Sequence, residues 1–330
     1  MSELQKVPIA VIGVGEHGKR HTHALKHVQG AELAGVYDQR QDRAAAVAAE
    51  LGVRAFRSLE EALEAVQAVS IVIPTTDHMV VARLAMEAGK DVLLEKPITR
   101  TLEEADELIE IADRTGRILQ VGHLERFNPG AVAAKAITRQ PLFFEIHRLG
   151  VFSPRSLDVD VVFDLMIHDL DLVLWFANTE ARDVRAVGLP VLTDRVDIAN
   201  ARVEFENGAV ANFTASRVST EKVRKFRYFQ PHEYVSIDFS RRDALLLSVG
   251  NDGQNPQIAF RKLEVRNTDP LEAELESFAD CVRTRRPPLV GGRQGRSALA
   301  LAEKVMFCIE EHAGRVMVPL TRPAGHSGEL

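Results

Sequence analysis

The sequence predicts a two-domain α/β protein: first a doubly wound parallel sheet with helices on both faces, then an α+β domain with a large, mainly antiparallel open sheet. Three observations support this prediction. The chain has 330 residues, about twice the usual length of one domain. Unbroken apolar strands alternate with amphipathic helices up to about residue 123. Beyond about residue 140, strands alternate apolar and polar side chains, which is typical of a sheet with one exposed face.

Composition excludes several classes of protein. Hydrophobic residues make up 45% of the chain and charged residues 27%, as in ordinary globular domains. The net charge of −6 and the scattered basic residues argue against nucleic acid or a membrane surface as a partner. We see no secretion signal and no apolar run of about 18 residues. Cys281 and Cys308 are too few for a disulfide framework or a cysteine zinc site, so we expect a cytoplasmic protein.

The first strand, residues 7–12, leads directly into a glycine-rich turn and a helix. The spacing G-x-G-x-x-G begins at Gly13. In this motif one glycine permits the tight turn, one lets the backbone approach a pyrophosphate, and one allows close helix-to-strand packing. Free N–H groups at the helix start then face the phosphates. The expected cofactor loop consists of Gly13, Gly15, Glu16, His17 and Gly18. A glycine turn with a purely structural purpose is the alternative.

A second strand, residues 32–37, ends at Asp38, about 20 residues after Gly18. An acidic side chain there accepts hydrogen bonds from a ribose diol and repels a 2′-phosphate, so the sequence favours NAD over NADP. Two alternatives stay open. Asp38 is suited to cap the helix expected over residues 42–51, and the nearby Arg40 and Arg43 would suit NADP.

The alternation continues to the end of the first domain. We expect helices over residues 59–66, 77–88 and 102–115, and strands over residues 69–73, 92–94 and 118–121. Ser58 with Glu61, and Thr101 with Glu104, form capping boxes. Continuous apolar strands indicate a parallel sheet covered on both faces. The prediction is a nucleotide-binding Rossmann domain over residues 1–123.

Residues 124–330 are predicted to form a substrate-binding and oligomerisation domain. Residues 199–205 alternate in polarity, and Asn207-Gly208 predicts a type I′ hairpin turn into the strand over residues 209–216. Further strands are expected over residues 225–229, 234–239 and 245–249. Helices are expected over residues 164–176, from Asp269 (N-cap) and Pro270 onward, and over residues 297–312. We expect the last helix to pack back on the first domain.

The open sheet has a consequence for assembly. A sheet covered on one face by its own helices must keep the other face polar or bury it against another subunit. We therefore expect a homodimer or a homotetramer. Because no linker is visible, the two domains are expected to pack rigidly around a ligand cleft.

Glu95, Lys96 and Pro97 follow the strand over residues 92–94. Ligands of open α/β sheets bind at the carboxyl ends of the strands, so a lysine held there by a proline is expected to point into the cleft. Beside a cationic nicotinamide ring its proton affinity should fall, which suits it to bind and polarise a substrate hydroxyl. A surface lysine without a function is the alternative.

Asp164, His168 and Asp171 recur at i, i+4 and i+7 of a predicted helix and therefore form a polar stripe on one face. Their apolar neighbours indicate burial, where polar groups are costly unless they are hydrogen-bonded or catalytic. Three interpretations compete: an N-cap aspartate with a satisfied core histidine, part of a metal site, or a general base, His168, oriented by Asp164. No second cluster of ligands supports a metal. Because histidine titrates near neutrality, we favour the general base.

These motifs resemble those of the Gfo/Idh/MocA oxidoreductases, over nearly the whole chain. The resemblance rests on residues 13–18, on residues 85–97 with their Glu-Lys-Pro, and on the Asp164, His168 and Asp171 stripe. It implies the catalytic set Lys96, Asp164 and His168, and a cofactor cleft lined by Pro74, Thr75 and His78, to which we add Glu95 and Lys96. It also implies oligomerisation through the open sheet. Met166 stands where many members have glycine, which should change the pocket shape more than the chemistry.

A narrower resemblance comes from residues 122–129, Gly-His-Leu-Glu-Arg-Phe-Asn-Pro, taken with residues 164–169. Both stretches are similar to members that oxidise the 3-hydroxyl of UDP-N-acetylglucosamine. This similarity implies a substrate site of Lys96, Arg126, Asn128, Asp164 and His168. Arg217 and Arg227 are further candidates for binding a diphosphate, with ordinary surface charge as an equal alternative.

The sequence thus predicts an NAD-dependent dehydrogenase of a nucleotide-activated sugar, with the 3-hydroxyl of UDP-N-acetylglucosamine as the expected position of oxidation. Lys96 binds the hydroxyl, His168 takes its proton, Asp164 orients the site, and hydride passes to nicotinamide. No metal is expected. Two alternatives stay open: a dehydrogenase of a free sugar or polyol, inositol-like or glucose-like, and a non-catalytic NAD-binding sensor.

Overall fold

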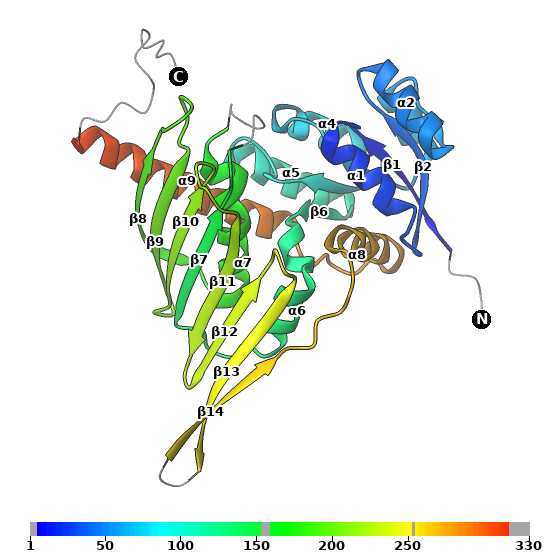
Figure 1. The fold of residues 1–330 in the computed structure, drawn as a ribbon. Helices are drawn as coiled ribbons and strands as arrows, with labels where there is room; N and C mark the ends of the chain where they lie inside the picture. Colours follow the sequence, from blue (N-terminus) through cyan, green and yellow to red (C-terminus); the bar gives the residue numbers. More distant parts are fainter. Residues whose placement is uncertain (1–4, 153–158, 253–254, 317–330) are drawn as a thin grey trace. The chain divides into compact units, whose positions relative to one another are not determined.

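The computed structural model describes residues 5–152, 159–252 and 255–316. They form two compact units, each assembled from two stretches of the chain. Unit 1 contains the residues up to Phe127 together with Thr268–Ser297, and unit 2 contains Asn128–Asn267 together with the residues from Ala298 onward. Figure 1 labels many of the elements of both units.

Unit 1 is built around a six-stranded parallel sheet in the order β3-β2-β1-β4-β5-β6. Its strands are β1 (Val7–Ile12), β2 (Ala31–Tyr37), β3 (Arg54–Ala55), β4 (Ala68–Ile71), β5 (Asp91–Glu95) and β6 (Leu119–Gly122). Strands β4 and β6 are buried along their whole length, as expected for a parallel sheet covered on both faces. The strand order reverses between β1 and β4, which is where such sheets bind ligands. The predicted doubly wound parallel sheet is confirmed.

The helices of unit 1 are α1 (Glu16–Leu25), α2 (Gln41–Leu51), α3 (Leu59–Ala65), α4 (Thr75–Glu87), α5 (Leu102–Thr115), the 3₁₀ turn η1 (Leu124–Phe127) and α8 (Pro270–Thr284). Two of them, α3 and α5, begin at the caps that the sequence predicts, whereas α2 begins after Arg40 rather than Asp38 and α4 begins two residues earlier than expected. The Ser58 hydroxyl accepts the Glu61 N–H and the Thr101 hydroxyl accepts the Glu104 N–H, so both predicted caps are present. Phe278 of α8 lies in the same hydrophobic core as the residues of β1, α1 and α2. Helix α8 therefore belongs to unit 1, although it follows the second sheet along the chain.

Unit 2 is built around an eight-stranded sheet in the order β14-β13-β12-β11-β7-β10-β9-β8. Its strands are β7 (Phe143–Leu149), β8 (Ala181–Leu189), β9 (Ile198–Phe205), β10 (Val210–Ser216), β11 (Val223–Gln230), β12 (Glu233–Asp238), β13 (Asp243–Asp252) and β14 (Asn255–Lys262). Neighbouring strands are antiparallel except β7 and β10, which are parallel. This confirms the large, mainly antiparallel sheet, while β7, β8 and β14 were not among the strands predicted.

The hairpin between β9 and β10 differs from the predicted type I′ turn. Such a turn needs positive φ at both central residues, which Asn207 and Gly208 were expected to supply. Only Gly208 has a positive φ, of 83°, and its N–H donates to the Phe205 carbonyl at 2.9 Å. The central residues of the turn are therefore Glu206 and Asn207. The prediction was wrong by one position, because the Asn207 side chain accepts the Ala209 N–H and holds the longer loop.

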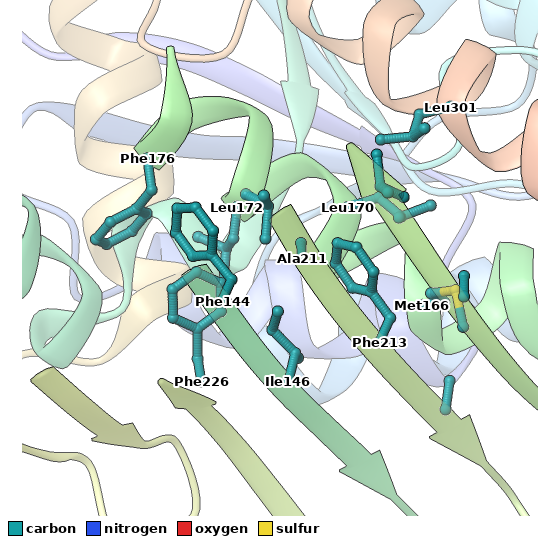
Figure 2. Close-up of a cluster of buried hydrophobic side chains, with 14 of the residues drawn as sticks. Phe144, Ile146, Met166, Leu170, Leu172, Phe176, Ala211, Phe213, Phe226 and Leu301 are labelled. Carbon is teal, nitrogen blue, oxygen red and sulfur yellow. The ribbon is translucent and has the colours of Figure 1, made fainter. Parts of the chain in front are cut away.

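The helices of unit 2 share a core with its sheet. They are α6 (Pro129–Ala136), the π-helical turn η2 (Val162–Met166), α7 (Ile167–Ala177) and α9 (Gly292–Val316), whose residues from Ala298 onward belong to this unit. Figure 2 shows Phe144 and Phe226 of the strands close to Phe176 of α7, and Phe213 of β10 belongs to the same core. The helix expected over residues 164–176 is therefore present, but it begins with a π turn.

Candidate active site

The glycine turn after β1 has the geometry that its spacing predicts. Gly13 has a φ of 87°, and a Cβ there would lie 2.4 Å from the Val72 carbonyl oxygen. A Cβ on Gly18 would lie 1.9 Å from the Gly13 oxygen, so only glycine allows this close approach of helix and turn. A Cβ on Gly15 would find only Arg43, at 3.9 Å. Gly15 therefore leaves room for a ligand to approach the backbone.

A cavity of about 460 Å³ lies at this turn. It is lined by residues at the carboxyl ends of β1, β2 and β4, where the strand order reverses. Of the predicted cofactor residues, the cavity brings together Gly13, Gly15, Asp38 and Pro74. The glycine turn, the acidic side chain and the cavity fit a dinucleotide.

Asp38 is 7% exposed, and the backbone holds both of its carboxylate oxygens. The N–H groups of Val14 and Arg40 each donate to it at 2.9 Å. Helix α2 takes Arg40 as its N-cap residue, so Asp38 does not cap that helix. The Arg43 guanidinium lies 3.4 Å from the carboxylate, while that of Arg40 pairs with Asp42 at 2.9 Å. Asp38 thus stands as a fixed acidic group beside the glycine turn.

Pro74, Thr75 and His78 lie at the start of α4, but only Pro74 lines the cavity. Pro74 is the N-cap residue and lines the cavity, and Thr75 is the first residue of the helix. His78 is 1% exposed, with Nδ1 at 2.9 Å from the Pro97 oxygen and Nε2 at 3.0 Å from the Ile73 oxygen. Burial lowers the pKa of His78, so the ring is neutral and donates through one nitrogen at a time. The ring connects the segments that follow β4 and β5.

Lys96 is half-buried and follows β5 directly. Its N–H donates to Glu95 Oε2 at 3.1 Å, and His21 Nε2 donates to Glu95 Oε1 at 3.1 Å. The other nitrogen of His21 lies 2.9 Å from the Ser70 hydroxyl. Burial opposes ionisation of Glu95, but the His21 hydrogen bond and the charges of His21 and Lys96 outweigh burial and hold its pKa at about 2. A fixed carboxylate therefore stands beside Lys96.

Four further predicted site residues differ in exposure: two are exposed and two are buried. Glu16 and His17 are exposed in the first turn of α1, where its N–H groups are directed outward. Arg126 in η1 and Asn128 are each 4% exposed. The Asn128 side chain accepts the Gly130 N–H at 3.0 Å and so caps α6.

The polar stripe of unit 2 begins on a π turn. Asp164 lies inside η2, with its N–H donating to the Asp160 carbonyl at 3.1 Å, so it is not an N-cap. His168 follows in the first turn of α7; both side chains are half-buried, whereas Asp171 is fully buried. A π turn widens the helix locally and is frequent at functional sites. Lys96 lies in unit 1, and Asp164 and His168 lie in unit 2.

Asp169, next to His168, forms a buried ion pair that the sequence did not reveal. Arg148 of β7 donates to its two oxygens at 2.8 and 2.7 Å. The two side chains are 4% and 3% exposed. The sequence does contain one indication of this pair. Arg148 lies on the same inward-facing side of β7 as Phe144 and Ile146, where a charged side chain needs a partner.

The two arginines considered for a diphosphate already have protein partners. Arg217 is 6% exposed, donates to the Val159 carbonyl and lies 3.7 Å from Asp197. Arg227 pairs with Glu145 at 2.9 Å across neighbouring strands. Neither arrangement supplies a guanidinium dedicated to a phosphate.

Residues 5–152, 159–252 and 255–316 contain no group of three or more His, Cys, Asp or Glu side chains that is arranged to hold a metal ion. In the same residues, no helix has both the length and the apolarity that crossing a bilayer requires.

Glu274 of α8 is a second group that the sequence reasoning missed. It is 0% exposed and lies on the apolar face of its helix, between Leu271 and Phe278. Its backbone oxygen accepts the side-chain amide of Gln120 in β6 at 3.2 Å. A glutamate at a core-facing helical position is a signal visible in the sequence.

Comparison with known proteins gives consistent results. Residues 7–123 match the Gfo/Idh/MocA model described as an oxidoreductase family with an NAD-binding Rossmann fold, and residues 139–229 match a C-terminal domain of the same family. UDP-N-acetylglucosamine 3-dehydrogenase of Acidithiobacillus ferrooxidans is 43% identical over 91% of this chain and 96% of its own. The structure of that enzyme in space group P21 matches the present structure with a TM-score of 0.87 and 40% sequence identity. The match covers 93% of this chain and 99% of that chain. Myo-inositol 2-dehydrogenase of Thermotoga maritima is 28% identical over 92% and 96%.

Proposed function

This chain belongs to the Gfo/Idh/MocA family of NAD-binding oxidoreductases, and from that premise we propose that it oxidises a secondary hydroxyl of a nucleotide-activated sugar. The first candidate is the 3-hydroxyl of UDP-N-acetylglucosamine. One observation carries this choice: the Acidithiobacillus enzyme is 43% identical over 91% of this chain, whereas the Thermotoga myo-inositol 2-dehydrogenase is 28% identical over 92%.

We assign the cofactor to residues of unit 1. Gly13, Gly15 and Gly18 would hold the pyrophosphate at the start of α1, beside Glu16 and His17, and Asp38 would accept the ribose hydroxyls. Pro74 and Thr75 border the same region, and His78 positions the segments after β4 and β5. NAD, when bound, supplies the acceptor for hydride. We propose a division of function between a cofactor domain, residues 1–123, and a substrate domain, residues 124–330, of which residues 268–297 pack in unit 1.

We assign the chemistry to three residues. Lys96, beside Glu95 and the cofactor region, would bind and orient the reacting hydroxyl as a hydrogen-bond donor. His168 would take the hydroxyl proton, and Asp164, one turn earlier on the same side of the helix, would orient the site. Arg126 and Asn128 would help to hold the substrate. Orientation of the hydroxyl against its base is the main contribution of these residues to the rate.

The test is turnover by variants that still bind cofactor. We expect Lys96→Ala and His168→Ala each to reduce kcat by at least about 100-fold, the usual contribution of a proton-transfer or orienting group. NAD affinity, measured by fluorescence titration, should stay within a few-fold of wild type. Near-normal turnover in both variants would contradict the assignment.

A free polyol is the second candidate substrate, because a relative of nearly full coverage is a myo-inositol 2-dehydrogenase. NADH formation should be measured with UDP-N-acetylglucosamine, its uronic acid, inositol and glucose. Turnover restricted to inositol would replace the nucleotide sugar in the proposal. Turnover of UDP-N-acetylglucosamine, followed by NMR of the product, would identify the oxidised carbon.

We also propose that the protein is a homodimer or homotetramer joined through the eight-stranded sheet. The helices of unit 2 pack on the inward side of this sheet, which carries Phe144 and Ile146. The alternate positions of β7 and β11 include the partly exposed Phe143 and Phe229, with ring centroids 5.5 Å apart. Light scattering should give a dimer or tetramer mass, and Phe143→Asp with Phe229→Asp should reduce it.

The proposed compartment is the reducing cytoplasm. Cys281 is buried and Cys308 is partly buried, and both are free thiols. Burial raises the pKa of both thiols, which keeps them in the unreactive protonated form. Cell fractionation followed by immunoblotting would test this assignment.

A further inference from the structure

Glu274 is a carboxyl group buried in unit 1 without a hydrogen bond to either oxygen from the described residues. It is 0% exposed and lies among the apolar residues on the buried face of α8. The Oε1 atom of Gln120, whose amide donates to the Glu274 backbone, is likewise buried and unbonded. A buried carboxylate without donors is far more costly than a neutral carboxylic acid in the same place.

Glu95 is the opposite kind of carboxyl group, because donors surround it. His21 and the Lys96 N–H hold its two oxygens, and Ser70 in turn holds the His21 ring. A Cβ on Gly122 would lie only 3.1 Å from the Glu95 carboxyl carbon, so the absent side chain makes room for the carboxylate. The geometry favours the charged form of Glu95.

The two carboxyl groups influence each other. Burial, and after it the negative charge of Glu95, raise the pKa of Glu274 well above its ordinary value of 4.5. The elements packed against α8 carry two buried titratable side chains, His21 of α1 and Arg126 of η1, whereas Glu32 of β2 is exposed. Both groups lie against β6, where Gln120 donates to the Glu274 backbone and Gly122 faces the Glu95 carboxyl. Two interacting carboxyl groups hold one charge at lower cost than two.

We propose that Glu95, held by His21, is the single anion beside Lys96 and positions it, while Glu274 stays a neutral acid and leaves that charge to Glu95. The Glu95 carboxylate then favours the protonated Lys96 ammonium at the end of β5. This role deepens the proposed function, since it rests on Lys96 as the residue that binds the substrate hydroxyl. Glu95 and His21 act through Lys96, not on substrate.

The first measurement observes the proton on Glu274 directly. Infrared difference spectra of the resting protein at pH 7 should show the C=O stretch of a protonated carboxylic acid, shifted in D₂O. The band should be absent from Glu274→Gln. It should persist in Glu276→Gln, a matched control on the same helix whose carboxylate accepts N–H groups of Gln29 and Gly30. A band unaffected by Glu274→Gln would overturn the proposal.

The second measurement reports on Lys96. The rate of acylation of Lys96 by acetic anhydride, followed by mass spectrometry, depends on the fraction of neutral amine. Removing the adjacent anion in Glu95→Gln should lower the Lys96 pKa by about one unit or more, which makes acylation at least about tenfold faster at pH 7. Glu274→Gln and Glu276→Gln should leave the rate within about twofold, as expected when a neutral or a distant group is replaced.

The outcomes separate the possible errors. If Glu274 carried the charge, the wild-type spectrum would lack the band that Glu274→Gln removes, and if Glu95 were neutral, Glu95→Gln would not accelerate acylation. If Glu95→Gln fails to fold, the Glu274→Gln spectrum still decides whether Glu274 is protonated. Neither measurement uses a substrate, so failure of the proposed function would appear in the Lys96→Ala turnover and not here.

Discussion

Two buried carboxyl groups, Asp169 of unit 2 and Glu274 of unit 1, are tolerated in opposite ways. In unit 2, Asp169 accepts two hydrogen bonds from the Arg148 guanidinium. Asp197, also in unit 2, accepts the N–H groups of Val191, Leu192 and Thr193. In unit 1, neither carboxyl oxygen of Glu274 has a hydrogen-bond partner among the described residues, and we propose that Glu274 stays neutral while Glu95 carries the charge. A buried acid is therefore tolerated either by pairing or by protonation, and only the second way makes stability fall as pH rises.

The largest expected effect comes from breaking the Arg148–Asp169 pair. Arg148→Met leaves Asp169 charged and buried without its partner, which should lower the free energy of unfolding by about 3–5 kcal/mol. Urea denaturation at pH 7 measures the loss. Arg227→Met is the matched control, because its pair with Glu145 is partly exposed and should contribute less than about 1 kcal/mol. Equal losses in the two variants would show that burial does not control the cost.

A smaller effect is expected at Glu95. Its pKa of about 2 lies below the ordinary value of 4.5, so its ionisation stabilises the fold above pH 4.5, and this contribution is lost as pH falls toward 2. Glu95→Gln should therefore cost about 3 kcal/mol at pH 7 and progressively less below pH 4.5. Urea denaturation at several pH values tests this. A cost independent of pH would mean that Glu95 acts through packing instead of charge.

The smallest effect is expected at Glu274, with the opposite dependence on pH. Its raised pKa means that the folded state keeps a proton that the unfolded state releases above about pH 4.5, so wild-type stability falls as pH rises from there toward the folded pKa. Glu274→Leu removes this dependence and an unbonded polar group. Its unfolding free energy at pH 7 should stay within about 1 kcal/mol of wild type or exceed it. A variant less stable at pH 9 than wild type would contradict a neutral Glu274.

Most of unit 1 was predictable because its signals are local. The apolar runs of β1, β4 and β5, the caps Ser58 and Thr101, and the glycine turn each depend on residues close together in the chain. The prediction of unit 2 was less complete. Strand β8 buries only two of its nine residues, so it carries little periodic signal, and β14 pairs at the edge of the sheet.

The candidate site likewise has a part that local sequence predicted and a part that depends on tertiary structure. Gly13, Gly15, Asp38 and Pro74 surround one cavity, as the spacing of the glycine motif and the following acidic residue had indicated. His78 is different, because its ring turns to two backbone carbonyls. That orientation depends on where β4 and β5 end relative to each other, which is a property of the sheet.

By itself the sequence determined the alternation of strands and helices, the glycine turn, and the residue types suited to hydride-transfer chemistry. These follow from side-chain polarity and backbone freedom over a few neighbouring residues. The tertiary structure alone decided the pairing of Arg148 with Asp169 and the unequal environments of Glu95 and Glu274. Electrostatic energy depends on burial and on the distance to a partner, and α1, β5 and α8 supply His21, Glu95 and Glu274 from separate parts of the chain.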